Sequence, residues 1–210
     1  MRCMTYYFFG IRFDEVLSCY FPYLRDKLSN ALCEVAIASI ESAAFFEEGE
    51  TTSFGTGFRI DKDKTLIALG QGPILFPPPA MVKAYVEYII VEEEVTRIPK
   101  RCFAGSRATS VIHRGYVHSI GEEAYSDMPY VEEADINTFT IPQGCFKNDV
   151  KLREFHLGES VFHVKENAFK NCPLLNVIYY YGDRNNFANI KVEDGNEAFV
   201  KARVFFMQNE

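Results

Sequence analysis

Four histidines are the side chains in this sequence that are best suited to metal binding or to proton transfer near neutral pH. They are His113, His118, His156 and His163. A metal centre needs ligands at short, fixed spacings, and a catalytic centre needs a nucleophile beside a base. These histidines fit neither pattern, and the six cysteines contain no CxxC pair and no histidine at zinc-finger distance. We therefore expect no catalytic residues, no metal site and no cofactor.

Glycine pairs and carboxylates indicate no catalytic centre either. Gly55-Thr56-Gly57 and Gly70-Gln71-Gly72 look like phosphate loops, but neither is followed by Gly-Lys-Ser/Thr or by a clear helix start. We interpret both as turns. Runs of glutamate such as 92–94, 122–123 and 132–133 are typical of solvated faces.

The composition is that of a folded chain with an acidic surface. The 210 residues are 48% hydrophobic, which is enough apolar material for a sizeable core. A formal net charge of -7 and the scarcity of basic clusters exclude nucleic acid as the expected partner. The uncharged stretch 65–82 contains three consecutive prolines, so we expect no membrane span. Arg12 and Asp14 interrupt the apolar N-terminal run, and we predict no signal peptide.

A six-residue pattern recurs four times, with an aliphatic residue first, a small residue fifth and an aromatic residue sixth. The aromatic residues lie 22, 21 and 23 positions apart, a period found in solenoid proteins. A unit of this length cannot bury its own apolar face, so the pattern predicts stacked coils with their aromatic rings one above another. The four copies are 98–103, 120–125, 141–146 and 164–169, ending at Phe103, Tyr125, Phe146 and Phe169.

Short alternating runs follow the aromatic residues and predict strands. The clearest runs are 152–157 and 175–180. Strands of successive coils would line up as a parallel sheet, about 4.8 Å apart. Cys102 and Cys145 hold the same position two coils apart, roughly 10 Å, which is too far for a disulfide. We expect these two residues and Cys172 to be buried thiols.

The coils resemble the leucine-rich repeat family typified by the BspA surface antigens, whose units read roughly IPxxVxxIGxxAFxxCxxLxxIxI. The closest matches are 120–125 and 164–175. The similarity extends from about residue 57 to residue 206, where Phe187 stands in place of a usual Trp in the closing cap. It implies an α/β leucine-rich repeat solenoid, rich in β-structure, with a parallel sheet of short strands and with turns or short helices on the other side. It also implies adhesion or protein recognition at the cell surface or in secreted form, without catalysis.

The first fifty residues allow two interpretations. Leucines at helical spacing between 24 and 35 favour an amphipathic helix, whereas the spacing of the apolar residues 37–45 repeats that of the later coils. We favour a helical N-terminal cap over a degenerate repeat. Residues 1–50 then form this first element, and 51–206 form the solenoid with a C-terminal cap from about 181.

The residues that alternate with the buried strand positions form the candidate binding site. Because successive side chains of a strand point to opposite faces, these residues are expected to project from one exposed sheet. Aromatic residues on such a surface are plausible anchors for a protein partner. The predicted ladder is Tyr88, Ile90, His113, Glu133, Asp135, Glu154, His156, Val177 and Tyr179.

The sequence thus predicts a protein-binding or adhesion module. Two alternatives stay open at this point: a small hydrolase or ligand-binding activity in the N-terminal third, and a purely structural segment of a surface array.

Overall fold

A computed structural model describes residues 7–8, 11–12, 58–60, 63–68, 72–74, 77–78 and 80–207. The predicted helix or degenerate repeat between 23 and 48 lies outside these residues. Near the N-terminus, β1 (Tyr7–Phe8) and β2 (Ile11–Arg12) form an antiparallel pair.

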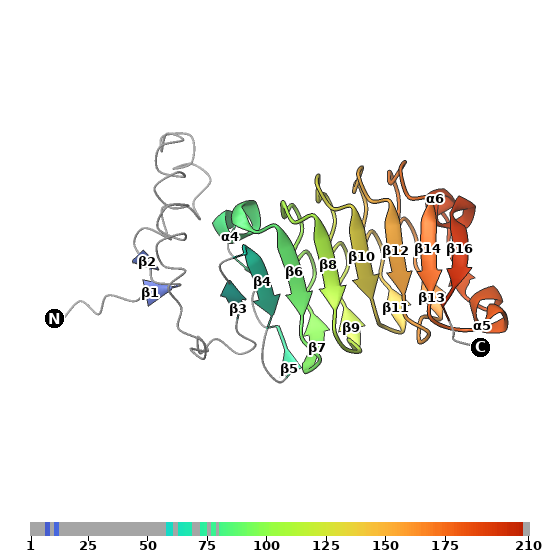
Figure 1. Ribbon diagram of the computed structural model, residues 1–210, viewed down its shortest axis with the longest axis horizontal. Helices are drawn as coiled ribbons and strands as arrows, with labels where there is room; N and C mark the ends of the chain where they lie inside the picture. Colours follow the sequence, from blue (N-terminus) through green and yellow to red (C-terminus); the bar gives the residue numbers. More distant parts are fainter. Residues whose placement is uncertain are drawn as a thin grey trace.

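In the part of the chain that the structure describes, eight strands form one sheet in the order β16-β14-β12-β10-β8-β6-β4-β3 (Figure 1). The short β3 (Phe58–Ile60) runs antiparallel to β4 (Thr65–Ala68), and every later neighbour is parallel. The predicted parallel sheet of short strands is therefore confirmed. Its remaining members are β6 (Tyr88–Val91), β8 (Ser110–His113), β10 (Glu133–Ile136), β12 (Glu154–Leu157), β14 (Val177–Tyr180) and β16 (Arg203–Phe206).

The other side of each coil carries very short strands joined by turns. One parallel group is β5 (Gly72–Pro73), β7 (Val95–Ile98) and β9 (Ser119–Ile120). A second is β11 (Thr140–Ile141), β13 (His163–Val164) and β15 (Lys191–Val192). The short helices are α4 (Ala80–Tyr85), α5 (Arg184–Ala188) and α6 (Glu197–Lys201). In Figure 1, α4 lies near β4 and β6, whereas α5 and α6 lie at the C-terminal end of the solenoid.

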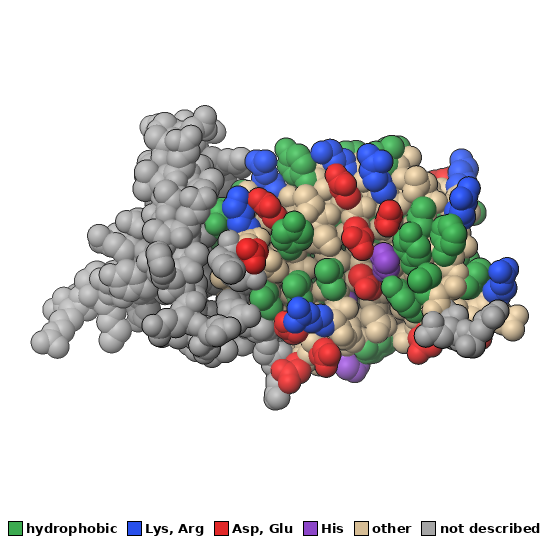
Figure 2. Space-filling view, viewed as in Figure 1, with side chains coloured by type: hydrophobic (Ala, Val, Ile, Leu, Met, Phe, Trp, Pro, Cys, Tyr) green, Lys and Arg blue, Asp and Glu red, His purple; other side chains and the backbone are tan. Residues whose placement is uncertain are grey.

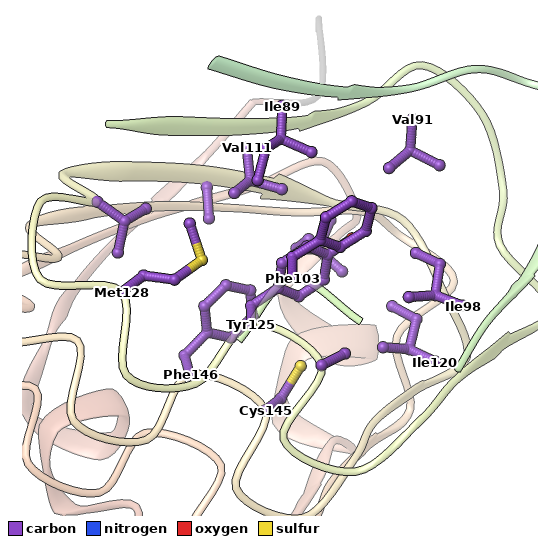
Figure 3. Packing of buried hydrophobic residues seen from close by; sticks show 14 of the residues in the cluster. Ile89, Val91, Ile98, Phe103, Val111, Ile120, Tyr125, Met128, Cys145 and Phe146 are labelled. Carbon is purple, nitrogen blue, oxygen red and sulfur yellow. The ribbon is translucent and has the colours of Figure 1, made fainter. Parts of the chain in front are cut away.

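The aromatic residues of the six-residue pattern form a stack through the core, as predicted. The ring centroids of Phe103 and Tyr125 lie 5.3 Å apart, those of Tyr125 and Phe146 5.3 Å, and those of Phe146 and Phe169 5.7 Å. The interplanar angles are 7°, 10° and 5°, so the rings are nearly parallel. Figure 3 shows the stack between the inward-facing strand residues and the aliphatic residues of the short strands. Phe199 of α6 continues the stack beyond Phe169 at 5.2 Å.

The three cysteines of the coils are free and buried, which confirms that prediction. Burial raises the pKa of the Cys172 thiol to about 12, and it also raises the pKa of Cys102 and Cys145. All three are therefore protonated at neutral pH. The Sγ of Cys172 donates a hydrogen bond to the carbonyl oxygen of Phe146 at 3.0 Å, which ties neighbouring coils together.

Each coil turns at two residues with left-handed backbone conformation. The fourth residue of the six-residue pattern has a φ of 54°, 53°, 61° and 57° in the four copies. A second such residue follows each aromatic residue by two positions, with a φ between 59° and 73°. Non-glycine side chains are strained in this region, so the turns impose a local cost that the packed core must outweigh. The residues are Arg101, Glu123, Gly144 and Asn167 at the first position and Gly105, Asp127, Asn148 and Asn171 at the second.

The turns are joined by backbone hydrogen bonds that run from coil to coil. The amide of Phe103 donates to the carbonyl of Ala124, and the amide of Phe146 donates to the carbonyl of Ala168. In the last coil, the amide of Phe169 donates instead to the side-chain oxygen of Asn196 at 3.0 Å. The predicted domain limits near residues 50 and 181 remain predictions.

Candidate functional site

The candidate site is the solvent-facing side of the large sheet, which we call the outer face. Along β6, β10 and β12, buried residues alternate with exposed or half-buried ones. The strand register aligns the outward residues of neighbouring strands in two rows. The first row is Tyr88, Ser110, Glu133, Glu154, Val177 and Arg203, and the second is Ile90, Ile112, Asp135, His156, Tyr179 and Phe205.

The expectation that His113 belongs to this face is wrong. Its side chain is 5% exposed, and its Nε2 atom lies 2.7 Å from the hydroxyl oxygen of Tyr125 in the core. The outward position is taken by Ile112, which pairs with Asp135. Strand β8 begins seven residues after Phe103, whereas the equivalent strands of later coils begin eight residues after their aromatic residue. A shift of one residue moves every side chain of a strand to the opposite face.

Four ring-bearing residues form what we call the aromatic cluster at the C-terminal part of the outer face: His156, Tyr179, Tyr181 and Phe205. The ring centroids of His156 and Tyr179 lie 4.7 Å apart, and those of Tyr179 and Phe205 lie 5.7 Å apart. The Nδ1 atom of His156 lies 2.9 Å from the hydroxyl oxygen of Tyr181. Phe205 and Tyr181 remain well exposed. The cluster is therefore a connected set of rings that contacts solvent.

Sequence reasoning missed two members of the aromatic cluster. Phe205 lies on β16, where the inward and outward alternation continues beyond the last recognised coil. Extending the alternation to 203–206 would have found it. Tyr181 follows the end of β14, and only the fold brings its hydroxyl to His156.

Three carboxylates lie beside the aromatic cluster and form what we call the acidic cluster: Glu133, Asp135 and Glu154. The Oε1 atom of Glu133 lies 3.2 Å from Nε2 of His156. Asp135 is half-buried, and its pKa is raised by burial, with the nearby Glu133 adding to the increase and His156 opposing it. Burial of Asp135 removes water from its carboxylate, so the charged form of this group is less favourable than it would be in solvent.

The N-terminal part of the outer face is apolar. Tyr88 is 42% exposed and Ile112 is 38% exposed, while Ile90 is half-buried between them. Figure 2 shows apolar side chains at both ends of the sheet and carboxylates with a histidine between them. The face thus combines two apolar regions with an acidic centre.

The described residues contain no feature of a metal centre. No group of three His, Cys, Asp or Glu side chains among them is arranged to hold a metal ion. Likewise, no helix in the described ranges has the length and apolar character needed to cross a bilayer.

Repeating coils, a stacked aromatic core and a parallel sheet with one free face define a solenoid repeat protein. The family model described as BspA type leucine rich repeat region matches residues 80–193 in six copies. The chain therefore belongs to this family, as the resemblance of its coils predicts. Proteins built from such repeats are generally non-catalytic modules, and they typically bind proteins or lie at surfaces.

Two solved structures are similar to this chain. One is a leucine rich cell surface protein from Faecalibacterium prausnitzii, with 16% identity and a TM-score of 0.48 over 66% of this chain and 41% of that chain. The other is a leucine-rich repeat protein from Eubacterium ventriosum, with 18% identity and a TM-score of 0.46 over 65% of this chain and 44% of that chain. The chain thus spans less than half the length of either protein. No curated protein is significantly similar to the sequence.

Proposed function

We propose that this chain is a protein-binding module of the adhesion type and that the outer face is its binding surface. The observation that carries the proposal is the exposed aromatic cluster beside the acidic cluster on one side of the sheet. Aromatic side chains supply much of the binding energy in protein interfaces, and contiguous exposed apolar groups mark interaction sites.

The way in which the face is supported also favours binding. Its side chains lie on strands that are held in register by parallel ladders and by the stacked rings beneath them. A surface fixed in this way loses little conformational freedom when a partner docks. The rings of His156 and Tyr179 are further fixed by contact with each other and with Tyr181 and Phe205.

We also propose that the module acts at the cell surface or in secreted form, because its coils resemble those of surface antigens. Immunodetection on intact and on permeabilised cells would test this. Signal from permeabilised cells alone would contradict the proposed location.

The binding surface is tested by capture of partners from an extract of surface and extracellular proteins. The chain is compared with the double variant Tyr179→Ala/Phe205→Ala. The control is Phe139→Ala/Phe162→Ala, because these two phenylalanines are stacked at 5.6 Å and are half-exposed but lie outside the rows of the outer face. Thermal unfolding of all three proteins is measured first.

We expect the intact chain and the control to retain the same specific partners and the outer-face variant to lose them. If all three proteins capture the same set of partners, the assignment of the outer face as the binding surface is contradicted. If only the control variant loses the partners, the binding surface includes Phe139 and Phe162 instead. No specific partner for the intact chain would favour a purely structural segment.

A further inference from the structure

The acidic cluster interrupts an otherwise apolar and aromatic surface. Asp135 is paired in register with Ile112 on one side and with His156 on the other. His156 is in turn paired with Tyr179. A partner that covers the apolar and aromatic regions must therefore also cover the carboxylates, and burial of unpaired carboxylates is costly.

Several carboxylates in the turns of this protein form ion pairs with cations of a neighbouring coil. Lys100 Nζ lies 2.6 Å from Glu122, and Arg114 Nη1 lies 2.9 Å from Glu92. In the acidic cluster the pattern is different. Within residues 80–207, no Lys or Arg forms an ion pair with Glu133, Asp135 or Glu154, and the histidine beside Glu133 is the one basic group in contact. The outer face thus carries three carboxylates that no Lys or Arg of the described part of the chain pairs with, although Arg203 lies in the first row two strands from Glu154.

From this arrangement we propose that the outer face binds an extended polypeptide segment whose Lys or Arg side chain enters the acidic cluster, with apolar residues on both sides of it. The inference rests on the proposed function and specifies the chemistry of the partner. A cation would pair with the carboxylates that a docked segment removes from water, and its flanking residues would cover the apolar region and the aromatic cluster.

The dimensions of the outer face suit an extended segment. From Ile90 to Phe205 the second row crosses five strand spacings of about 4.8 Å each, roughly 24 Å in total. An extended chain covers this length with about seven residues. Asp135 lies one strand spacing from Ile112 and two from Tyr179. The partner segment is therefore expected to place apolar residues within about three positions of its cation on either side.

The aromatic cluster adds a second reason for a cationic partner. A Lys or Arg side chain that passes over the rings of Tyr179 or Phe205 would be attracted to the faces of the rings as well as to the carboxylates. An acidic segment or a phosphate backbone would instead be repelled by the acidic cluster. The apolar regions alone would accept segments of any charge, whereas the acidic cluster favours a cationic segment over an acidic one.

The test selects peptides from a displayed library of random twelve-residue sequences on the full chain. The best binders are then measured by fluorescence anisotropy against two triple variants that change the net charge equally. The outer-face variant is Glu133→Gln/Asp135→Asn/Glu154→Gln, and the control is Glu93→Gln/Glu94→Gln/Glu159→Gln. The control carboxylates are exposed and lie in turns.

We expect the enriched peptides to carry Lys or Arg between apolar residues. The outer-face variant should weaken their binding by about tenfold or more, and the control by less than about twofold, because distant surface charges are screened. Both variants must unfold at the temperature of the intact chain. If the outer-face triple variant unfolds early, the single change Asp135→Asn replaces it, with an expected loss of about threefold.

Four results would overturn the inference. Enriched peptides without basic residues that still lose binding with Tyr179→Ala/Phe205→Ala would refute the cationic partner and leave the proposed function intact. If both triple variants weaken peptide binding equally, the peptides are attracted by the net charge of the protein and not by the acidic cluster. Failure to enrich any peptide, or peptides insensitive to every change on the outer face, would rule out an extended segment there, and the latter result would also contradict the proposed function.

Discussion

The Nε2 atom of His113 lies 2.7 Å from the hydroxyl oxygen of Tyr125, and both side chains are buried. In the neighbouring strands, the inward position of His113 is occupied by Val91 and Ile136. The neighbours of Tyr125 in the ring stack are phenylalanines. This coil therefore contains a hydrogen-bonded pair where the neighbouring coils contain apolar residues. Each of the two polar side chains supplies the buried hydrogen-bond partner of the other.

We predict that Tyr125→Phe lowers the free energy of unfolding by about 1–3 kcal/mol, because it leaves Nε2 of His113 buried without a partner. The other ring nitrogen, Nδ1, already has no hydrogen bond. Urea unfolding measures the loss. The double variant His113→Val/Tyr125→Phe should recover most of it, since an apolar pair occupies these positions in the adjacent coils. Simple addition of the two single effects would refute the coupling.

Stability should fall in acid because of His113. Burial lowers the pKa of this histidine from 6.5 to about 3 in the folded protein. Below pH 6.5 the unfolded chain binds a proton that the folded chain does not, so the contribution of neutral His113 is lost progressively as the pH falls from about 6.5 to about 3. Above this window it is constant. Urea titrations at several pH values measure how the free energy of unfolding changes with pH. This dependence should be weaker in His113→Val and unchanged in His118→Gln, because His118 is exposed.

Truncation of the ring stack should be severely destabilising. We expect Phe146→Ala to lower the free energy of unfolding by about 3–5 kcal/mol, as large core truncations do. Phe146 is fully buried and stacks on Tyr125 and Phe169. The control Phe139→Ala removes a half-exposed ring and should cost far less. A loss below about 1 kcal/mol for Phe146→Ala would be incompatible with a ring packed on both sides.

The left-handed turn at Glu123 offers a stabilising substitution. Its φ of 53° is strained for any residue that has a Cβ atom. In the next copy of the six-residue pattern the equivalent position is occupied by a glycine, Gly144. We expect Glu123→Gly to raise the free energy of unfolding by about 0.5–1 kcal/mol. The ion pair with Arg101 is solvent-exposed, so its loss subtracts little. The neighbouring change Glu122→Gly should instead lower stability, and thermal unfolding separates the two.

Much of the solenoid could be predicted because its core follows a strict period. The rings at Phe103, Tyr125, Phe146 and Phe169 recur with nearly constant spacing, and that spacing predicts the stack and the parallel sheet that accompanies it. Side-chain alternation then predicts most of the outer face. This logic fails only where the length of a connection changes, as it does before β8 and His113.

The features that sequence reasoning missed depend on three-dimensional proximity or on backbone geometry. Arg101 and Glu123 adopt left-handed conformations that neither residue type signals. The contact of Tyr181 with His156 joins residues 25 positions apart. Within residues 80–207, Asp135 and Glu154 form no ion pair with Lys or Arg, and this property of neighbouring coils cannot be recognised before the register of the strands is known.

The carboxamide of Asn196 ends the series of backbone bonds between turns, by accepting from the amide of Phe169 and donating to the carbonyl oxygens of Lys165 and Glu193. This side chain thus takes the place of the backbone carbonyl groups that accept from the amides of Phe103 and Phe146 in the earlier coils. The hydrogen bond of the Phe169 amide is therefore open to removal by a single substitution, whereas those of Phe103 and Phe146 are fixed by the backbone.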